Sequence, residues 1–98
     1  MLTYNECLER IKKARNGRVK LENNTYLYRS GTDFTVVLHN TAVVTVRHNG
    51  TFVLNTGGWK TRTTKDRINQ FSPARIYQKR GAWYLQDGKE YQDGMVVS

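Results

Sequence analysis

The sequence predicts an α+β fold, in which an N-terminal helix packs on a curled, mostly antiparallel sheet or partial barrel, with a short second helix after Thr64. Apolar residues recur at helical spacing through residues 3–16, whereas residues 19–54 form short runs of β-branched and aromatic residues between turn residues. A chain of 98 residues closes one modest core, so we expect a single domain over residues 1–98.

The N-terminal helix is predicted from its start signal and its apolar stripe. Thr3 and Glu6 have the spacing of a capping box. The stripe then runs down to Gly17, and its members are Tyr4, Cys7, Leu8, Ile11 and Ala14. This pattern indicates an amphipathic helix with one face on the core.

Five consecutive strands are predicted after this helix. The runs are residues 19–22, 25–29, 34–39, 42–48 and 51–54. The turn signals between them are Asn23-Asn24, Ser30-Gly31-Thr32-Asp33, Asn40-Thr41 and Asn49-Gly50. A two-residue turn at Asn49-Gly50 would place Arg47 opposite Phe52 and Val46 opposite Val53. That register leaves apolar groups on both faces, so we expect the sheet to curl.

The second half of the chain predicts a short helix and a hairpin. Thr63 or Thr64 can cap a helix within residues 61–71, with Asp66 in its first turn, and Ser72-Pro73 ends it. Residues 74–78 and 82–86 then flank the turn Arg80-Gly81. A final short strand is expected at residues 95–97, after Asp93-Gly94.

Cysteine usage and hydropathy bear on the compartment. Cys7 is the sole cysteine, so no internal disulfide forms, and no run approaches the roughly 20 apolar residues that span a bilayer. We therefore expect a cytoplasmic protein without a membrane partner. With one cysteine and two histidines, we expect no metal site and no cofactor.

The charge balance points to an anionic partner. Sixteen Lys and Arg against eight Asp and Glu give a net charge of +8 at pH 7. Such a field favours a polyanion or an acidic protein surface.

The strongest candidate site lies in residues 55–67, where a glycine pair and several threonines precede a helix start. An anion-binding loop is predicted here, made of Gly57, Gly58, Thr61, Thr63 and Thr64. The spacing differs from that of a P-loop. In the alternative interpretation the glycines serve a bend, a threonine caps the helix and the charges are merely solvated.

The basic residues around this loop predict contacts to nucleic-acid phosphates. The central contacts are Lys60, Arg62, Lys65 and Arg67, and the supporting contacts are Arg47, Arg75 and Lys79. Trp59 is the candidate for stacking on a base, unless it is the core residue that holds the loop.

The residues available for catalysis are few, so we expect no enzyme. His39 and His48 end neighbouring predicted strands and could approach each other as an acid/base pair, although each can equally sit at a strand end near a turn. Cys7 lies on the apolar helix face, where a buried thiol is expected rather than a nucleophile.

Several segments resemble a family of small proteins encoded by tailed bacteriophages and prophages. They are Asn23-Asn24-Thr25-Tyr26-Leu27, Leu38-His39-Asn40-Thr41, Leu54-Asn55-Thr56-Gly57-Gly58-Trp59, Thr63-Thr64-Lys65-Asp66-Arg67-Ile68-Asn69 and Trp83-Tyr84. The resemblance implies an accessory protein in the cytoplasm of an infected bacterium. Such proteins commonly bind nucleic acid or inhibit a host defence enzyme, CRISPR effectors among them.

The sequence thus favours a non-enzymatic protein that binds nucleic acid, DNA or RNA, with little sequence specificity. Three alternatives stay open: an inhibitor that binds an acidic host protein, a protein that sequesters a nucleotide or small anion, and a small ribonuclease using His39 and His48. A homodimer is possible if the apolar sheet faces are shared between subunits.

Overall fold

The computed structural model describes residues 1–98. The elements in order are α1 (Tyr4–Lys12), β1 (Arg18–Glu22), β2 (Thr25–Ser30), β3 (Asp33–Leu38), β4 (Thr41–Val46), β5 (Phe52–Leu54), α2 (Arg62–Phe71), β6 (Tyr77–Lys79), β7 (Ala82–Tyr84) and β8 (Val96–Val97). The predicted α+β class is confirmed.

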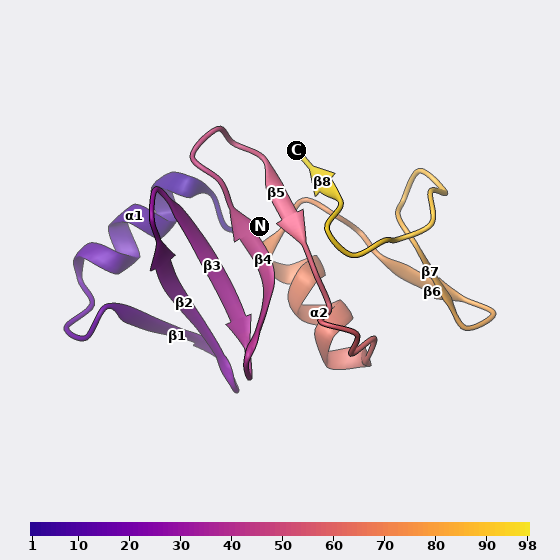
Figure 1. Ribbon diagram of the computed structural model, residues 1–98, viewed down its shortest axis with the longest axis horizontal. Helices are drawn as coiled ribbons and strands as arrows, with labels where there is room; N and C mark the ends of the chain where they lie inside the picture. The colour runs from indigo at the N-terminus through magenta and orange to yellow at the C-terminus, as the bar shows by residue number, and fades with distance from the viewer.

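One open sheet dominates the molecule. Its strand order is β1-β2-β3-β4-β5-β8, and every neighbouring pair is antiparallel. The five strands predicted from residues 19–54 form the meander, and the C-terminal β8 adds itself beside β5. The sheet does not close into a barrel, because β1 and β8 remain as its two edges (Figure 1).

The predicted register of β4 and β5 is wrong by one residue. Val46 lies opposite Phe52, and the N–H of Arg47 donates to the carbonyl of Thr51. The loop is a turn in which the N–H of Gly50 donates to the Arg47 carbonyl, with Gly50 at φ +88°. A turn of this kind, followed by glycine in the left-handed region, makes a three-residue hairpin loop rather than the two-residue loop that Asn-Gly first suggests.

The corrected register gives the sheet one buried face. Val44 lies opposite Leu54 and Val46 opposite Phe52, and all four side chains are buried. Leu27, Phe34 and Val36 extend the same face across β2 and β3. The largest apolar side chains of β4 and β5 therefore share one face, and Val53 of β5, which lies on the other face opposite Thr45, is only half-buried, so the sheet needs no closure to hide them.

Both helices cover this buried face. The Tyr4 ring of α1 packs edge-on against Phe34 at 5.1 Å between centroids. On α2, Ile68 and Phe71 belong to the same hydrophobic cluster as Phe34. Arg67 of α2 donates a hydrogen bond to the hydroxyl of the buried Thr25 of β2. The opposite face of the sheet carries no helix (Figure 1).

The helix boundaries follow their caps. Thr3 and Glu6 form the predicted capping box, and α1 ends at Lys12, well before Gly17. Thr61 caps α2, because its hydroxyl accepts from the N–H of Thr64. The predicted cap at Thr63 or Thr64 is wrong, α2 begins before Thr64, and Asp66 lies beyond the first turn.

The segment after α2 forms a separate hairpin. β6 and β7 pair through the predicted Arg80-Gly81 turn, in which both residues have positive φ as a type I′ turn requires. This hairpin extends away from the large sheet, so the molecule is elongated, at 43 × 26 × 17 Å (Figure 1). Trp83 of β7 packs against Tyr91 and ties the hairpin to the core.

Candidate functional site

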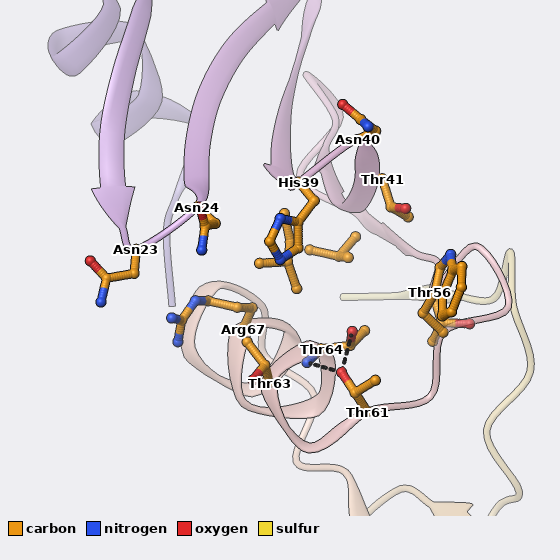
Figure 2. Close-up of a pocket in the computed structure, with 13 residues that line it drawn as sticks. Asn23, Asn24, His39, Asn40, Thr41, Thr56, Thr61, Thr63, Thr64 and Arg67 are labelled. Atoms are coloured by element: carbon orange, nitrogen blue, oxygen red, sulfur yellow. Dashed lines mark hydrogen bonds between the residues drawn. The ribbon is translucent and has the colours of Figure 1, made fainter.

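A polar cleft of about 760 Å³ lies between one end of the sheet and the first turns of α2. Thirteen residues line it, three of them hydrophobic, so amides, hydroxyls and a guanidinium face the cavity together with apolar carbon. Figure 2 shows two hairpin tips, one with Asn23 and Asn24 and one with His39 and Asn40, across from the first turns of α2; the His39 side chain points toward the helix and the Asn40 side chain points away from it.

The two hairpin tips form one wall of the cleft. Asn23-Asn24 joins β1 to β2, and His39-Asn40 joins β3 to β4, one residue earlier than the predicted Asn40-Thr41 turn. The N–H of His39 donates to the carbonyl of Asn24 at 2.8 Å, which holds the tips together. His39 has φ +56°, a conformation that side-chain-bearing residues seldom adopt. This backbone turns the His39 side chain toward α2 (Figure 2).

The first turns of α2 form the opposite wall. Thr61, Thr63, Thr64 and Arg67 all line the cleft. The Thr61 hydroxyl caps the helix and lies 3.0 Å from the Thr64 hydroxyl (Figure 2). No acidic residue occupies the first turn, so the partial positive charge of the helix N-terminus is not offset there.

Arg67 is the only charged residue that lines the cleft. Its Nε donates to the buried Thr25 hydroxyl at 2.9 Å, which fixes the guanidinium against β2. No Asp or Glu belongs to the lining. The cleft is therefore positive, and a phosphate or carboxylate is the charge that it would attract.

The loop from Thr56 to Thr61 forms the third side and is anchored by Asp93. The Asp93 carboxylate accepts from the N–H and the hydroxyl of Thr56, each at 2.9 Å, and from the Tyr91 hydroxyl at 2.8 Å. Burial alone would raise the pKa of Asp93, but the hydrogen bonds from Tyr91 and Thr56 and the charge of Lys60 outweigh it and lower that pKa. Burial first, and then the hydrogen bond to Asp93 and the negative charge of that carboxylate, raise the pKa of the Tyr91 hydroxyl.

Trp59 stands exposed at the cleft. Its side chain lines the cavity, yet 70% of the residue is open to solvent, so it is not the core residue that holds the loop. Two backbone hydrogen bonds fix its place instead, one from its N–H to the Thr56 carbonyl and one from the Thr61 N–H to its own carbonyl. An exposed indole on a fixed loop offers a flat apolar surface next to the polar cleft.

The predicted anion loop and central cations divide around this cleft. Trp59, Thr61, Thr63, Thr64 and Arg67 line it, whereas Gly57, Gly58, Lys60, Arg62 and Lys65 do not. Counted at about 100° per residue, Arg62 and Lys65 lie about 140° and 160° around the helix axis from Arg67. Arg62 faces solvent and approaches Asp66 at 4.0 Å. Lys60 instead lies 5.9 Å above the Tyr91 ring.

The predicted supporting cations lie away from the cleft. Arg47 follows β4 at the opposite end of the sheet, and Lys79 is exposed on the β6–β7 hairpin. The Arg75 guanidinium donates to the backbone carbonyls of Asn69, Ser72 and Ala74, at 3.1–3.5 Å. Arg75 thus binds the carbonyls at the end of α2.

The expected approach of the two histidines is wrong. His39 follows β3 and His48 follows the antiparallel β4, so they lie at opposite ends of the sheet, roughly 20 Å apart. His48 contacts Asp33, with Nδ1 and Oδ1 3.0 Å apart, and the backbone hydrogen bond from His48 is the main cause that lowers the pKa of Asp33. No acid/base pair exists between the histidines for a ribonuclease mechanism.

Cys7 is buried as predicted. The residue is fully inaccessible to solvent, and burial raises the pKa of its thiol to about 12.

No three His, Cys, Asp or Glu side chains are grouped so as to hold a metal ion. Neither helix has the length and hydrophobicity that a membrane-spanning helix requires.

Comparison with known families identifies the kind of protein. Residues 4–98 match the Kyanoviridae Gp96 protein family. The chain belongs to this phage family. The expected kinship with bacteriophage proteins is thereby confirmed at the level of the family. No curated protein matches the chain, and no solved structure matches it either.

Sequence reasoning missed the hairpin-tip side of the site in this Kyanoviridae Gp96 family member. The sequence predicts Asn23, Asn24, Asn40 and Thr41 as turn residues and His39 as a strand-end residue or one half of an acid/base pair, and it does not point to Thr56. A signal was present, because alternate turns of an antiparallel meander lie at the same end of the sheet. The β1–β2 and β3–β4 turns therefore bring their polar residues together at one end of the sheet, and the β2–β3 and β4–β5 turns lie at the other end.

Proposed function

We propose that this protein binds unpaired nucleic acid without enzymatic activity, with a nucleotide unit in the polar cleft. The observation that carries the proposal is Trp59, which is 70% exposed beside a cleft whose only charge is Arg67. An exposed aromatic next to a cationic, hydroxyl-rich cavity suits a base and its phosphate together. The net charge of +8 would draw such a polyanion to the surface.

Low sequence specificity is expected at this site. A ring stacked on Trp59 is selected by its flat face rather than by its hydrogen-bonding edge, because every base has a π-face. Threonine hydroxyls and the Arg67 guanidinium would contact phosphate oxygens, which are the same in every nucleotide.

The test is a titration of fluorescent single-stranded DNA and RNA, and of their duplexes, across a salt series. We expect tight binding of single strands at low salt, with log K falling by about 0.7 per log unit of salt for each phosphate contact. Trp59→Ala should weaken binding by about fivefold or more. Arg67→Gln should weaken it and make the salt dependence shallower.

Arg62→Gln is the matched control, since it removes the same charge from the same helix on the side away from the cleft. Its effect should stay within about twofold. No binding of any nucleic acid at low salt would refute the proposal and point to an acidic protein partner. Equal losses for Arg62→Gln and Arg67→Gln would show that the cleft is not the contact.

A second candidate is sequestration of a free nucleotide, which the cleft volume of about 760 Å³ favours because it falls in the range of small-molecule sites. Competition separates the two. A nucleoside monophosphate that displaces a ten-nucleotide strand at equal concentration would favour sequestration. A requirement for a large excess would favour the strand.

A further inference from the structure

The uncovered face of the large sheet carries aromatic and basic side chains rather than an ordinary solvated surface. By register, Lys20 of β1 lies opposite Tyr26 of β2, and Arg18 lies opposite Tyr28. Val37 and Thr35 continue these two rows on β3. Both tyrosines are half-buried, so their rings rest on the sheet and each keeps part of its surface in water.

Arg18 is held in place over this surface. Its guanidinium carbon lies 4.5 Å from the centroid of the Tyr26 ring, and Nη1 approaches the Tyr28 hydroxyl at 3.5 Å. A guanidinium lying on an aromatic ring is a cation–π contact, and both groups are surfaces on which a base stacks.

The charges on this face favour an anion over a second copy of the protein. Arg18, Lys20 and Arg47 lie on the uncovered side by strand alternation, and Asp33 is the acid among them. The carboxylate of Glu22 accepts instead from Gln70 of α2, on the covered side. Two such faces placed together would bring like charges into contact, whereas a polyanion would neutralise them.

The face also adjoins the proposed nucleotide cleft. The Asn23-Asn24 tip lines the cleft, and Tyr26 and then Tyr28 follow it along β2. A strand that leaves the cleft at this tip therefore meets the two tyrosines in turn. Their side chains are two residues apart on one strand, which places them on the same face with room for successive splayed bases.

We propose that the uncovered sheet face is a stacking platform on which a single strand of nucleic acid continues from the cleft. Tyr28 and the Arg18–Tyr26 pair stack with bases, and Arg18 and Lys20 contact phosphates. This inference rests on the proposed function, which it extends from one nucleotide unit to a length of strand.

The experiment compares a two-nucleotide with a ten-nucleotide strand of fluorescent oligo(dT) or oligo(U). Tyr28→Leu should weaken binding of the longer strand by about 5- to 30-fold and leave the shorter unchanged. Tyr28→Phe, which keeps the ring, should bind within about twofold of wild type. The double variant Arg18→Gln/Lys20→Gln should lower the salt slope of the longer strand.

Tyr77→Leu on the β6–β7 hairpin is the matched control, because it removes an exposed aromatic far from the platform. Urea unfolding of each variant establishes that the folded state is retained. If Trp59→Ala weakens both strands while Tyr28→Leu affects neither, the proposed function stands and the platform is refuted. If no strand binds wild type, both fail.

Self-association is the other outcome that would overturn the platform. Light scattering at the titration concentrations should give the mass of one chain of 11.4 kDa. A dimer that Tyr28→Leu dissociates would assign this face to a second copy.

Discussion

Gly57 lies so close to Thr41 that a side chain does not fit there. A Cβ at this position would lie 2.9 Å from Thr41 Cγ2, and Gly57 has φ +61°. We expect Gly57→Ala to lower the free energy of unfolding by about 1–3 kcal/mol through its φ alone, and further through the overlap. Urea denaturation measures the change.

Gly58→Ala is the control for this prediction. Gly58 has φ +88° but open space around it, so only the backbone cost applies. Thr41→Ala removes the two atoms that crowd this position, Cγ2 at 2.9 Å and Oγ1 at 3.0 Å. In a Thr41→Ala background, the loss of unfolding free energy caused by Gly57→Ala should therefore fall to that caused by Gly58→Ala. Equal penalties in both backgrounds would mean that the loop moves away from β4.

Asp93 anchors the loop that carries Trp59, and its ionisation is linked to stability. Its pKa is lowered in the folded protein, so the carboxylate stabilises the fold above its ordinary pKa of 3.8. That stability is lost as the pH falls through the folded-state value. We expect Asp93→Asn to lower the free energy of unfolding by about 1 kcal/mol at pH 6, since the group is partly exposed.

The difference between wild type and Asp93→Asn should shrink below about pH 3.8. Urea denaturation at pH 6 and pH 3 measures this difference. Asp33 and Glu6 also have lowered pKa values, but their contributions to the pH dependence of stability cancel in the difference, because wild type and variant both contain them. Asp66→Asn is the control, with an expected change within about 0.5 kcal/mol at either pH. A constant difference at both pH values would contradict the role of the charge.

At the scale of the element, α2 depends on side chains beyond its own ends. Arg75 donates to three carbonyls around the C-terminus of α2, so we expect Arg75→Ala to lower the free energy of unfolding by about 1 kcal/mol. Lys79→Ala, on the exposed hairpin, should stay within about 0.5 kcal/mol. Thermal unfolding measures both. If Arg75→Ala leaves the melting temperature unchanged and makes the salt dependence of nucleic-acid binding shallower, Arg75 contacts phosphate, as the sequence predicts, rather than stabilising α2.

Each element could be predicted from local signals, but the loop length and the pairing register between β4 and β5 could not. Asn49-Gly50 fits a two-residue turn, and it also fits the end of a three-residue loop, because both place Gly50 in the left-handed region. Burial decides between them. Only the longer loop puts Val46 and Phe52 on the face that the helices cover.

At the scale of the whole molecule, half of the candidate site could be predicted. Thr61, Thr63, Thr64, Arg67 and Trp59 lie in one segment whose composition indicates anion binding. The other wall comes from turns some 20 to 40 residues earlier in the chain, and only the pairing of strands brings it there. Placement on α2 then separates Arg67 from Arg62 and Lys65, which composition alone had grouped together.

The N-terminus, α1 and the sheet are tied into one core, and Cys7 reports on it. The Leu2 N–H donates to the Phe71 carbonyl of α2, and the Tyr4 hydroxyl donates to the Thr32 carbonyl beside β3. Leu2 and Cys7 are both buried in the same cluster. Detaching α1 would therefore open contacts to both α2 and the sheet, so we expect Cys7 to become exposed only when the whole molecule unfolds.

Reaction of Cys7 with an aromatic disulfide reagent measures this opening. In the native protein it should be about a thousandfold slower, or more, than in urea-unfolded protein. The logarithm of the native rate should rise with urea at the slope found for global unfolding. Leu2→Ala should flatten that slope at low urea, because it frees α1 to open first. A flat slope in wild type would show that α1 detaches by itself from a sheet that stays folded.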